Sequence, residues 1–489
     1  MAVKPFTQPL VAMSMCVLVS LAACSRSSQP EPPSTPPGAV PFAPPKAICG
    51  AGSRPELSMQ GRVTKAEHDS GRAAEGYTCN TELIGSHVIP GAIGTVGGFK
   101  VERYTDAAGH DCAYYDSTLA FPTNLLDGEM GVNVLDMSDP TQPVLTERLV
   151  SLAMLSPHES LVVNAQRGVL AAVAGNPALL PGIVDLYDIS ADCRHPVLKS
   201  SLPLAIAGHE SSMAPDGRTF YVASPGTPTL TAIDISNLSA PVPLAVLPYY
   251  SHGLSISADG NRAYLAGVGV PGSACAYAVT CDLPDPNLDR ALVILDISEI
   301  QSRKPNPQVR EVARLTWYPM SIPQNAIPFT RRGRPYLLEI DEFARSGEVG
   351  AARIIDIADE TQPKVVSDLR LAVHQPENFE TVAADPGNQF IGQGYAGHYC
   401  NVPTRVDPDI VACSMILSGL RVFDIRDPAR PREIAYFNAP MNPRLTPYLV
   451  ASGYAMSSPS FVPERKEIWY TDVYSGFYAL RLTNDAWPD

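Results

Sequence analysis

Clusters of basic residues are missing from this sequence. Its 489 residues include 36 Lys and Arg against 50 Asp and Glu, which gives a formal net charge of −14, and no Lys/Arg run occurs. A nucleic-acid partner needs a basic face that neutralises phosphates. The charge balance therefore predicts that nucleic acid is not a partner.

Common catalytic signatures are missing as well. The sequence has no GxSxG, no HExxH and no phosphate-binding glycine loop. GTVGG at Gly94–Gly98 is not followed by a helical pattern, so a dinucleotide site is not expected there. No CxxC pair occurs, which argues against a zinc ribbon or a thioredoxin-type site. None of these short motifs therefore indicates a catalytic site in this sequence.

Long apolar runs are missing except near the N-terminus. Leu10–Ala23 is apolar, follows Lys4, and is too short to span a bilayer as a mature helix. Its ending, LAAC at Leu21–Cys24, resembles the bacterial lipobox, in which the Cys is lipidated and becomes the new N-terminus. The resemblance implies a lipid on Cys24, and Ser25 after it implies the outer membrane, with membrane contact through the lipid anchor only. An ordinary signal peptide that is cleaved nearby is the alternative.

The residues after Cys24 are rich in Pro and Ser. The stretch up to Lys46 cannot bury a core, so it is expected to form an extended tether. We divide the chain into a lipoprotein signal peptide (1–23), the tether (24–46), an irregular N-terminal segment that a disulfide pins (47–81) and a repeat domain (82–489).

Eight cysteines follow Cys16 and Cys24. An even number in an exported chain suggests disulfides. The pairs Cys275–Cys281 and Cys400–Cys413 would each close a short loop. For the four cysteines that remain, we choose Cys49–Cys79 and Cys112–Cys193 among the three possible pairings. Free buried thiols are the alternative.

One pattern of strand, turn and strand recurs along the chain. Its acidic positions are 46 to 68 residues apart, and internal repeats of this kind indicate a propeller or a solenoid. The copies are VNVLDMS (from Val132), VDLYDIS (Val184), LTAIDIS (Leu230), LVILDIS (Leu292), ARIIDIA (Ala352), LRVFDIR (Leu420) and the degenerate FYALRL (Phe477). The shared acidic residues are Asp136, Asp188, Asp234, Asp296, Asp356 and Asp424. We interpret them as caps of backbone NH groups in turns rather than as catalytic groups.

Each unit contains four expected strands. In the third unit Asp216-Gly217 forms a hairpin turn, and Thr219–Ala223, Leu230–Ser236 and Val242–Leu247 are the later strands. Seven such units predict an all-β fold, a seven-bladed β-propeller with four antiparallel strands per blade. Too few residues follow Leu482 to complete the last blade. We therefore expect Glu82–Val88 to pair with Phe477–Leu482 and close the ring.

The repeat consensus, [LV]x[IVL][LIF]DI[SA] followed by DPxxP, resembles the LVIVD repeat of bacterial β-propeller proteins. The resemblance covers most of residues 82–482, implies the fold, and says little about activity. Pro271–Asp289 and Tyr395–Met415 are expected to be insertions between the second and third strands of the fourth and sixth blades. Propeller binding sites usually lie in such loops or at the mouth of the channel.

Histidines recur at the expected starts of the innermost strands. His209 and His252 lie seven residues before the Asp of their hairpin turns, and His158 has the same relation to its own hairpin. Because innermost strands line the axial channel, we expect these imidazoles to converge, where they could hold one divalent transition metal such as Zn²⁺, Cu²⁺ or Fe²⁺. His374 could add a fourth ligand. A water-lined channel in which the histidines only cap strands is the alternative.

Other polar residues complete this expected site. The same count assigns Asn325, Asn378 and Ser457 to the channel lining. Glu159, Glu210 and Glu377 are weak candidates for partners of the histidines or for a general base. The remaining histidines, His68, His87, His110, His195 and His398, are isolated in sequence, although His398 could reach the channel mouth from its place beside Cys400.

An acidic loop offers a second, weaker candidate. Asp282, Asp285, Asn287 and Asp289 alternate oxygen ligands that could bind Ca²⁺. The loop lacks the Gly and the terminal Glu of an EF-hand, so a solvated acidic loop is the favoured interpretation.

Two functions remain open. The favoured one is an outer-membrane-anchored binding or scaffolding module that presents propeller loops to an envelope protein, peptide or glycan. The alternative is a metal-dependent oxidase or hydrolase with a His-lined site at the propeller axis.

Overall fold

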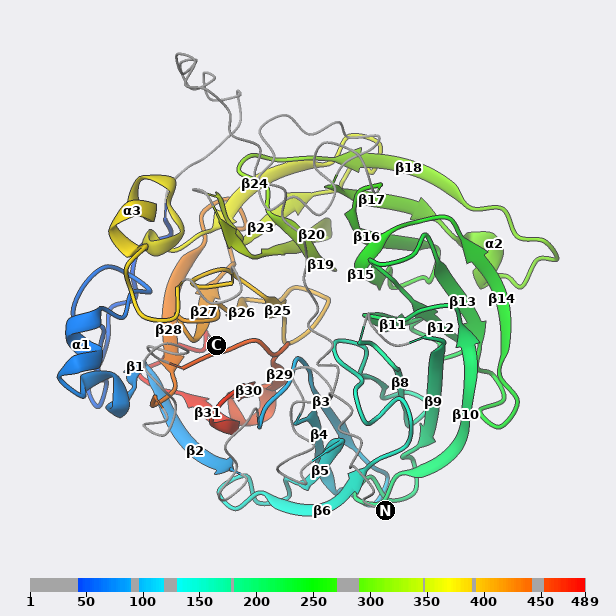
Figure 1. Cartoon of the computed structure of the whole chain (residues 1–489), viewed down its shortest axis with the longest axis horizontal. Helices are drawn as coiled ribbons and strands as arrows, with labels where there is room; N and C mark the ends of the chain where they lie inside the picture. The colour runs from blue at the N-terminus through cyan, green and yellow to red at the C-terminus, as the bar shows by residue number, and fades with distance from the viewer. Residues whose placement is uncertain are drawn as a thin grey trace, which may run out of the picture. The chain divides into compact units, whose positions relative to one another are not determined.

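The computed structural model describes residues 43–88, 96–117, 130–176, 180–270, 290–345, 348–388, 393–441 and 453–488. In this part of the chain seven β-sheets surround a common axis (Figure 1), each built from antiparallel strands. The prediction of an all-β, seven-bladed propeller is confirmed.

In the first six blades the strands follow chain order from the axis outward. The first blade contains β3 (Val101–Thr105), β4 (Asp111–Asp116), β5 (Val132–Asp136) and β6 (Val144–Leu149). The second contains β7 (Val162–Asn164), β8 (Val169–Val173), β9 (Gly182–Asp188) and β10 (Val197–Ala205). The third contains β11 (Ser211–Met213), β12 (Thr219–Val222), β13 (Leu230–Asp234) and β14 (Val242–Leu247). The fourth blade contains β15 (Ser251–Ile256), β16 (Arg262–Val268), β17 (Arg290–Asp296) and β18 (Arg310–Leu315). The fifth contains β19 (Ile322–Arg331), β20 (Arg334–Glu342), β23 (Ala352–Asp356) and β24 (Lys364–Leu369). The sixth contains β25 (Tyr399–Asn401), β26 (Ile410–Ser414), β27 (Leu420–Asp424) and β28 (Arg432–Asn438).

The seventh blade joins strands from both ends of the domain. Its inner three strands are β29 (Ser460–Val462), β30 (Glu467–Asp472) and β31 (Gly476–Leu482), and its outermost strand is β2 (Thr81–His87). β2 runs antiparallel to β31, with Thr81 opposite Leu482 and His87 opposite Phe477 (Figure 1). The backbone groups along this edge of β31 are therefore paired.

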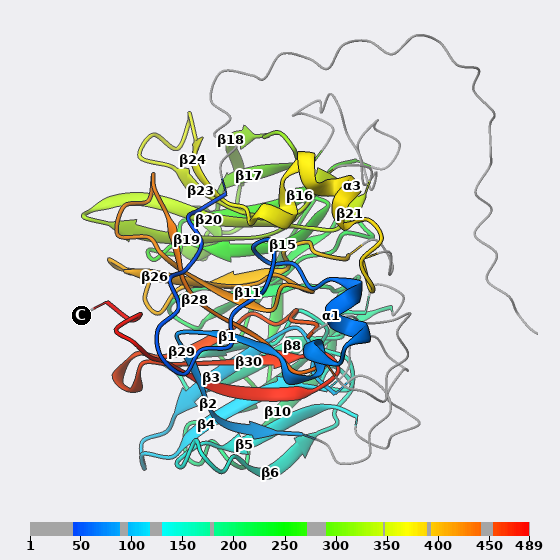
Figure 2. The same cartoon turned by 90° about the vertical axis from the view of Figure 1, so that its left-hand side faces the viewer.

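The segment before β2 lies on the outer side of the sixth blade (Figures 1 and 2). It contains the helix α1 (Lys65–Asp69), the 3₁₀ turn η1 (Arg72–Glu75) and the strand β1 (Tyr77–Cys79). β1 pairs with β28 as a fifth strand of that sheet, and a disulfide joins Cys79 to Cys49.

Short elements occupy some of the connections. They are α2 (Ser298–Gln301), α3 (Phe379–Val382), the 3₁₀ turns η2 (Ala372–His374), η3 (Pro376–Asn378) and η4 (Pro463–Arg465), and the small hairpin of β21 (Ala344–Arg345) and β22 (Glu348–Val349). Among the described residues, no helix has the length and apolar character that a membrane span requires.

The repeated Asp residues cap turns, as their pattern predicts. Each ends the third strand of its blade, and its Oδ1 accepts a hydrogen bond from the backbone NH two residues later. The donor–acceptor distances run from 2.8 to 3.0 Å at Asp136, Asp188, Asp234, Asp296, Asp356 and Asp424. The signature of the repeat is therefore a structural one.

Apolar strand residues fill the spaces between neighbouring blades. For example, Leu230 of β13 and Leu265 of β16 lie in one buried cluster that joins the third and fourth blades. Burial of each such side chain contributes roughly 1.5–3 kcal/mol. This packing fixes the innermost strands, and with them the residues that face the axis.

The expected insertion at Tyr395–Met415 is wrong. This stretch contains β25 and β26, the first and second strands of the sixth blade, and a disulfide joins Cys400 to Cys413, which lie opposite each other on these strands. The connection between β25 and β26 contains no glycine, whereas Asp385-Pro386-Gly387, further upstream, imitates a hairpin turn. Cys112 and Cys193 also form a disulfide. Pro271–Asp289, with Cys275 and Cys281, lies outside the described residues, as do Cys24 and the expected signal peptide.

Candidate metal centre

Four histidines lie where innermost strands begin. His252 is the second residue of β15, His398 directly precedes β25, and His209 precedes β11 by two residues. His158 lies in the connection that leads into β7. Figure 1 shows β11, β15 and β25 around the axis. The four side chains are therefore supplied by four different blades.

Three ligand-type atoms converge at one point. The Nε2 atoms of His209 and His252 are 2.9 Å apart, and Oε2 of Glu159 lies 3.4 Å from each. Atoms that bind one ion at about 2.0–2.2 Å are spaced about 3–3.5 Å from one another. All three side chains are at least 90% buried. Their spacing is that of ligands around a single metal ion.

A second group of atoms lies on the other side of Glu159. Nε2 of His398 is 3.3 Å from Glu159 Oε1 and 3.3 Å from Glu342 Oε2. Glu342 Oε1 in turn lies 3.5 Å from His252 Nε2. Nε2 of His158 is 3.8 Å from Glu159 Oε1. The two carboxylates therefore stand between histidines of different blades.

Backbone carbonyls orient two of the imidazoles. Nδ1 of His209 lies 3.1 Å from the carbonyl oxygen of Gly175, and Nδ1 of His398 lies 2.7 Å from that of Met456. A carbonyl only accepts, so both Nδ1 atoms carry the hydrogen, which makes Nε2 the nitrogen that can bind a metal. This arrangement is characteristic of histidine ligands.

The buried carboxylates of the histidine cluster favour positive charge on the imidazoles. Burial lowers the pKa of His398, but the facing Glu159 and Glu342 outweigh it and raise that pKa to about 9. Burial likewise opposes a charge on His252, yet Glu159 raises its pKa above the usual value. Burial raises the pKa of Glu159, but the imidazoles of His252, His209 and His158 bring it well below the ordinary range. Protons supply the balancing charge in the metal-free protein, and a divalent cation can replace them.

Glu210 stands behind His252. Its Oε1 accepts hydrogen bonds from Lys100 Nζ (3.1 Å) and from Asn325 Nδ2, and its Oε2 faces His252 Nδ1 at 3.9 Å. A Cβ atom on Gly253 would lie 1.6 Å from this Oε2, so only glycine admits the carboxylate here. Glu210 is thus placed to orient His252.

A cavity of about 590 Å³ lies along the innermost strands, where its walls include Glu210. Lys100, Asn325 and Tyr399 also line it, and Nζ of Lys100 lies 4.2 Å from the ring centre of Tyr399. The cavity therefore borders the carboxylate that faces His252.

Several residues that the sequence assigned to this site lie elsewhere. His374 belongs to η2, where its Nδ1 accepts a hydrogen bond from the backbone NH of Leu371. Glu377 and Asn378 belong to η3; the former is exposed, and the latter donates to the carbonyl oxygen of Ala372. The expectation that Asn378 begins an innermost strand is wrong, because these turns lie in the connection between β24 and β25.

Ser457 is buried and accepts a hydrogen bond from the backbone NH of Thr471, which ties it to β30. The candidate Ca²⁺ ligands Asp282, Asp285, Asn287 and Asp289 lie outside the described residues.

Glu342 is the ligand-type residue that the sequence reasoning missed. It ends β20, the second strand of its blade, whereas the repeated histidine spacing marks only the starts of innermost strands. A usable signal was the sequence LEIDE at Leu338–Glu342, because carboxylates are rarely buried without partners. His398, which the sequence already indicated as able to reach the channel mouth, lies in the cluster. It is seven residues before Arg405 in the connection between β25 and β26, the spacing that His209 and His252 have to their own turns.

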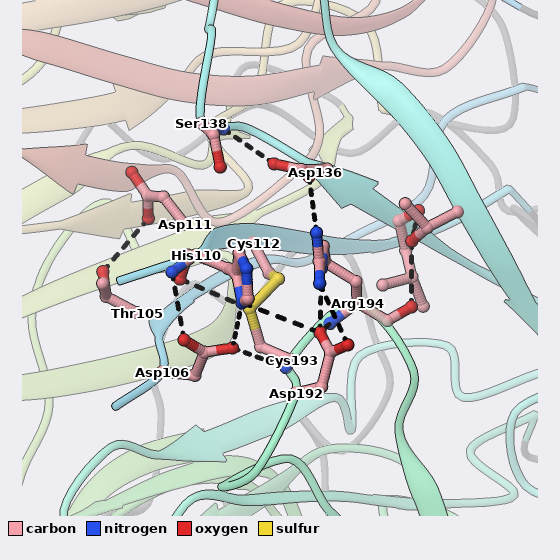
Figure 3. Close-up of a disulfide and its surroundings, with 12 residues drawn as sticks. Thr105, Asp106, His110, Asp111, Cys112, Asp136, Ser138, Asp192, Cys193 and Arg194 are labelled. Carbon is pink, nitrogen blue, oxygen red and sulfur yellow. Dashed lines mark hydrogen bonds and ion pairs between the residues drawn. A yellow bond between two sulfur atoms is a disulfide. The ribbon is translucent and has the colours of Figure 1, made fainter. Parts of the chain in front are cut away.

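A second group of His and Asp residues surrounds the Cys112–Cys193 disulfide (Figure 3). Asp106 Oδ2 lies 2.8 Å from His110 Nδ1 and accepts a hydrogen bond from the backbone NH of Cys193. Its Oδ1 accepts from the backbone NH groups of Ala108 and His110. Because these bonds occupy the oxygens of Asp106, this group stabilises the local backbone and is not a candidate ligand-binding site.

Comparisons with known proteins identify the repeat. A family model described as the LVIVD repeat matches residues 215–244. This match and the seven-bladed fold fit an LVIVD-repeat β-propeller. No curated protein is significantly similar in sequence.

Solved structures show distant likenesses. A functionally unknown protein from Desulfotomaculum acetoxidans DSM 771 aligns with a TM-score of 0.43 and 10% identity, over 71% of this chain and 90% of that one. Kuenenia stuttgartiensis hydrazine synthase aligns with a TM-score of 0.47 and 12% identity, over 81% and 99%. A putative 6-phosphogluconolactonase from Bacteroides fragilis NCTC 9343 aligns with a TM-score of 0.44 and 11% identity, over 81% and 92%.

Proposed function

We propose that this propeller is a metal-dependent enzyme whose site lies where the innermost strands begin. The observation that carries the proposal is the convergence of His209 Nε2, His252 Nε2 and Glu159 Oε2 within 2.9 to 3.4 Å. Imidazole and carboxylate ligands suit Zn²⁺, Fe²⁺ and Cu²⁺, and Mn²⁺ when carboxylates predominate. When bound, such an ion supplies Lewis-acid or redox chemistry.

The chain's own residues prepare the site for this role. Gly175 and Met456 fix the rings of His209 and His398 through hydrogen bonds to Nδ1. Burial keeps bulk water away, so the interaction between cation and carboxylate is stronger than at a surface. Glu210 lines the cavity and places its negative charge 3.9 Å from His252 Nδ1, so it lies between the metal position and the cavity.

Elemental analysis of the purified chain tests the proposal. We expect stoichiometric transition metal in the wild-type protein, and a loss of at least 100-fold in metal affinity in His209→Ala and in Glu159→Gln. The second variant keeps the size of the side chain and removes its charge, so it separates ligand loss from misfolding. His195→Ala is the matched control, because His195 is exposed and lies outside the cluster. A wild-type protein without bound metal after incubation with Zn²⁺, Fe²⁺, Cu²⁺ and Mn²⁺ would refute the proposal.

Glu210 should control metal affinity without binding the metal itself. Carboxylates that orient a histidine ligand typically contribute 10–100-fold to affinity. We therefore expect Glu210→Gln to weaken metal binding by about 10–100-fold in a competition titration with a chelator, with the stoichiometry unchanged. Glu102→Gln changes another carboxylate on the same cavity and should leave the affinity within about 2-fold. Equal effects of the two substitutions would contradict the orienting role.

The location of the protein remains a proposal that rests on the lipobox resemblance. Lipid attachment at Cys24 would hold the propeller at the outer membrane through the tether. A binding or scaffolding role toward an envelope protein, peptide or glycan is the function that remains if the chain holds no metal. Radiolabelled palmitate incorporation that disappears in Cys24→Ala is the expected result for the anchor.

A further inference from the structure

Each of the two buried carboxylates divides its oxygens between the same pair of histidines. Glu159 directs Oε2 to His252 and Oε1 to His398, at 3.4 and 3.3 Å. Glu342 directs Oε1 to His252 and Oε2 to His398, at 3.5 and 3.3 Å. Two carboxylates that span the same two imidazoles form the pattern expected where each carboxylate bridges two ions.

The number of donor atoms exceeds what one ion needs. The Nε2 atoms of four histidines and the four oxygens of the two glutamates give eight donors, whereas zinc in proteins usually takes four ligands. His209 and His252 lie on the Oε2 side of Glu159, and His398 lies on its Oε1 side. Nε2 of His158 is 3.8 Å from Oε1, but a ligand-type atom of His158 also lies within 4.8 Å of one on His209, so His158 is close to both sides. The donors thus separate into two groups that share the carboxylates.

We propose that the centre holds two divalent transition-metal ions, bridged by Glu159 and Glu342. His209 and His252 bind the first ion, and His398, with His158 beside it, binds the second. Two-metal sites place their ions about 3.5–4 Å apart and stabilise both the attacking and the leaving oxygen of a displacement. Hydrolysis of an ester or phosphoester is therefore the reaction class that this geometry favours. The inference rests on the proposed function and deepens it.

The surroundings of the second position support this assignment. Nε2 of Gln324 lies 3.5 Å from His398 Nε2, and its Oε1 is buried without a hydrogen-bond partner among the described residues. Because the two ends of an amide are interchangeable by rotation, Gln324 can turn its oxygen toward the ion. The Phe99 ring packs against both His158 and His398, with ring centres 4.3 and 5.2 Å apart, and shields this side.

Metal stoichiometry tests the inference. The chain is stripped with a chelator, reloaded with Zn²⁺ or Co²⁺, separated from free metal and analysed for metal per chain. We expect two ions in the wild-type protein and in His195→Ala, and one ion in His398→Ala. In Glu342→Gln, which preserves size, we expect the second ion to bind at least 10-fold more weakly. Cu²⁺-loaded wild-type protein should show spin–spin coupling in its EPR spectrum, and His398→Ala should not.

The outcomes separate this inference from the proposed function. One ion in the wild-type protein that is lost in His209→Ala but kept in His398→Ala would overturn the two-ion centre and leave the proposed function intact. Two ions in His398→Ala would also overturn it. No bound ion in the wild-type protein would overturn both.

Discussion

Replacement of Arg421 by methionine should lower the free energy of unfolding by about 3–5 kcal/mol, because it removes the guanidinium that two buried carboxylates, Glu56 and Glu433, share. Lys46 Nζ lies 3.6 Å from Glu56 Oε2, but it is partly exposed and compensates only one of the two charges. Arg421 lies on β27 and is fully buried. Its Nη1 donates to Glu433 Oε1 at 2.9 Å, and its Nη2 donates to Glu56. Its Nε donates to the carbonyl oxygen of Ser418, and its guanidinium carbon lies 4.4 Å from the centre of the Tyr436 ring. These contacts join the N-terminal segment to the sixth blade.

The loss of stability in Arg421→Met arises from uncompensated charge, so neutralising the facing carboxylates should reverse part of it. Denaturant unfolding measures the loss in Arg421→Met, and Arg430→Met provides the control, since the Arg430 side chain is 86% exposed and forms a surface ion pair with Asp427. The triple variant with Glu56→Gln and Glu433→Gln should recover part of the loss, because it buries no unpaired charge. If Arg421→Met were as mild as Arg430→Met, the buried ion cluster would not anchor the N-terminal segment.

The architecture could be predicted because its signals are local. Asp216-Gly217 sits at a turn where Gly217 has φ +65°, and Asp234 accepts its hydrogen bond from the NH of Ser236. Each of these features depends on a few neighbouring residues, so the sequence shows them directly. The pairing of Cys112 with Cys193 has no local signal, because the four cysteines outside the two short loops allow three pairings; the one expected is the one that forms.

The site could be predicted only in part, because it depends on long-range register. Counting back from a hairpin turn found His209 and His252, whose turns carry the Asp-Gly signal. The same count failed in the sixth blade, where Asp385-Pro386-Gly387 imitates a turn and the true one lacks glycine. It therefore selected Asn378 and His374 and passed over His398. Glu342 reaches the axis from the end of a second strand, and no innermost-strand count could find it.

Loss of the Cys112–Cys193 disulfide should be the largest covalent effect on stability. The bond closes a loop with a sequence separation of 81, and the chain-entropy account gives about 4–5 kcal/mol for a loop of this length. It joins β4 of the first blade to the connection between β9 and β10 of the second. The expected result for Cys112→Ala/Cys193→Ala is a fall of that size in the free energy of unfolding, measured by denaturant titration.

The two shorter disulfides provide controls for the cause. Cys49–Cys79 has a sequence separation of 30 and Cys400–Cys413 one of 13, so their removal should cost about 3.5–4 and about 3 kcal/mol. If the loss of unfolding free energy rises with the length of the loop that each disulfide closes, the disulfides stabilise the protein by restricting the unfolded chain. If the losses do not depend on loop length, the disulfides act on the folded state instead. The Cys112–Cys193 bond would then stabilise the folded state by holding the hydrogen bonds around it in place. The bond that the backbone NH of Cys193 donates to Asp106 Oδ2 is the first of these to test.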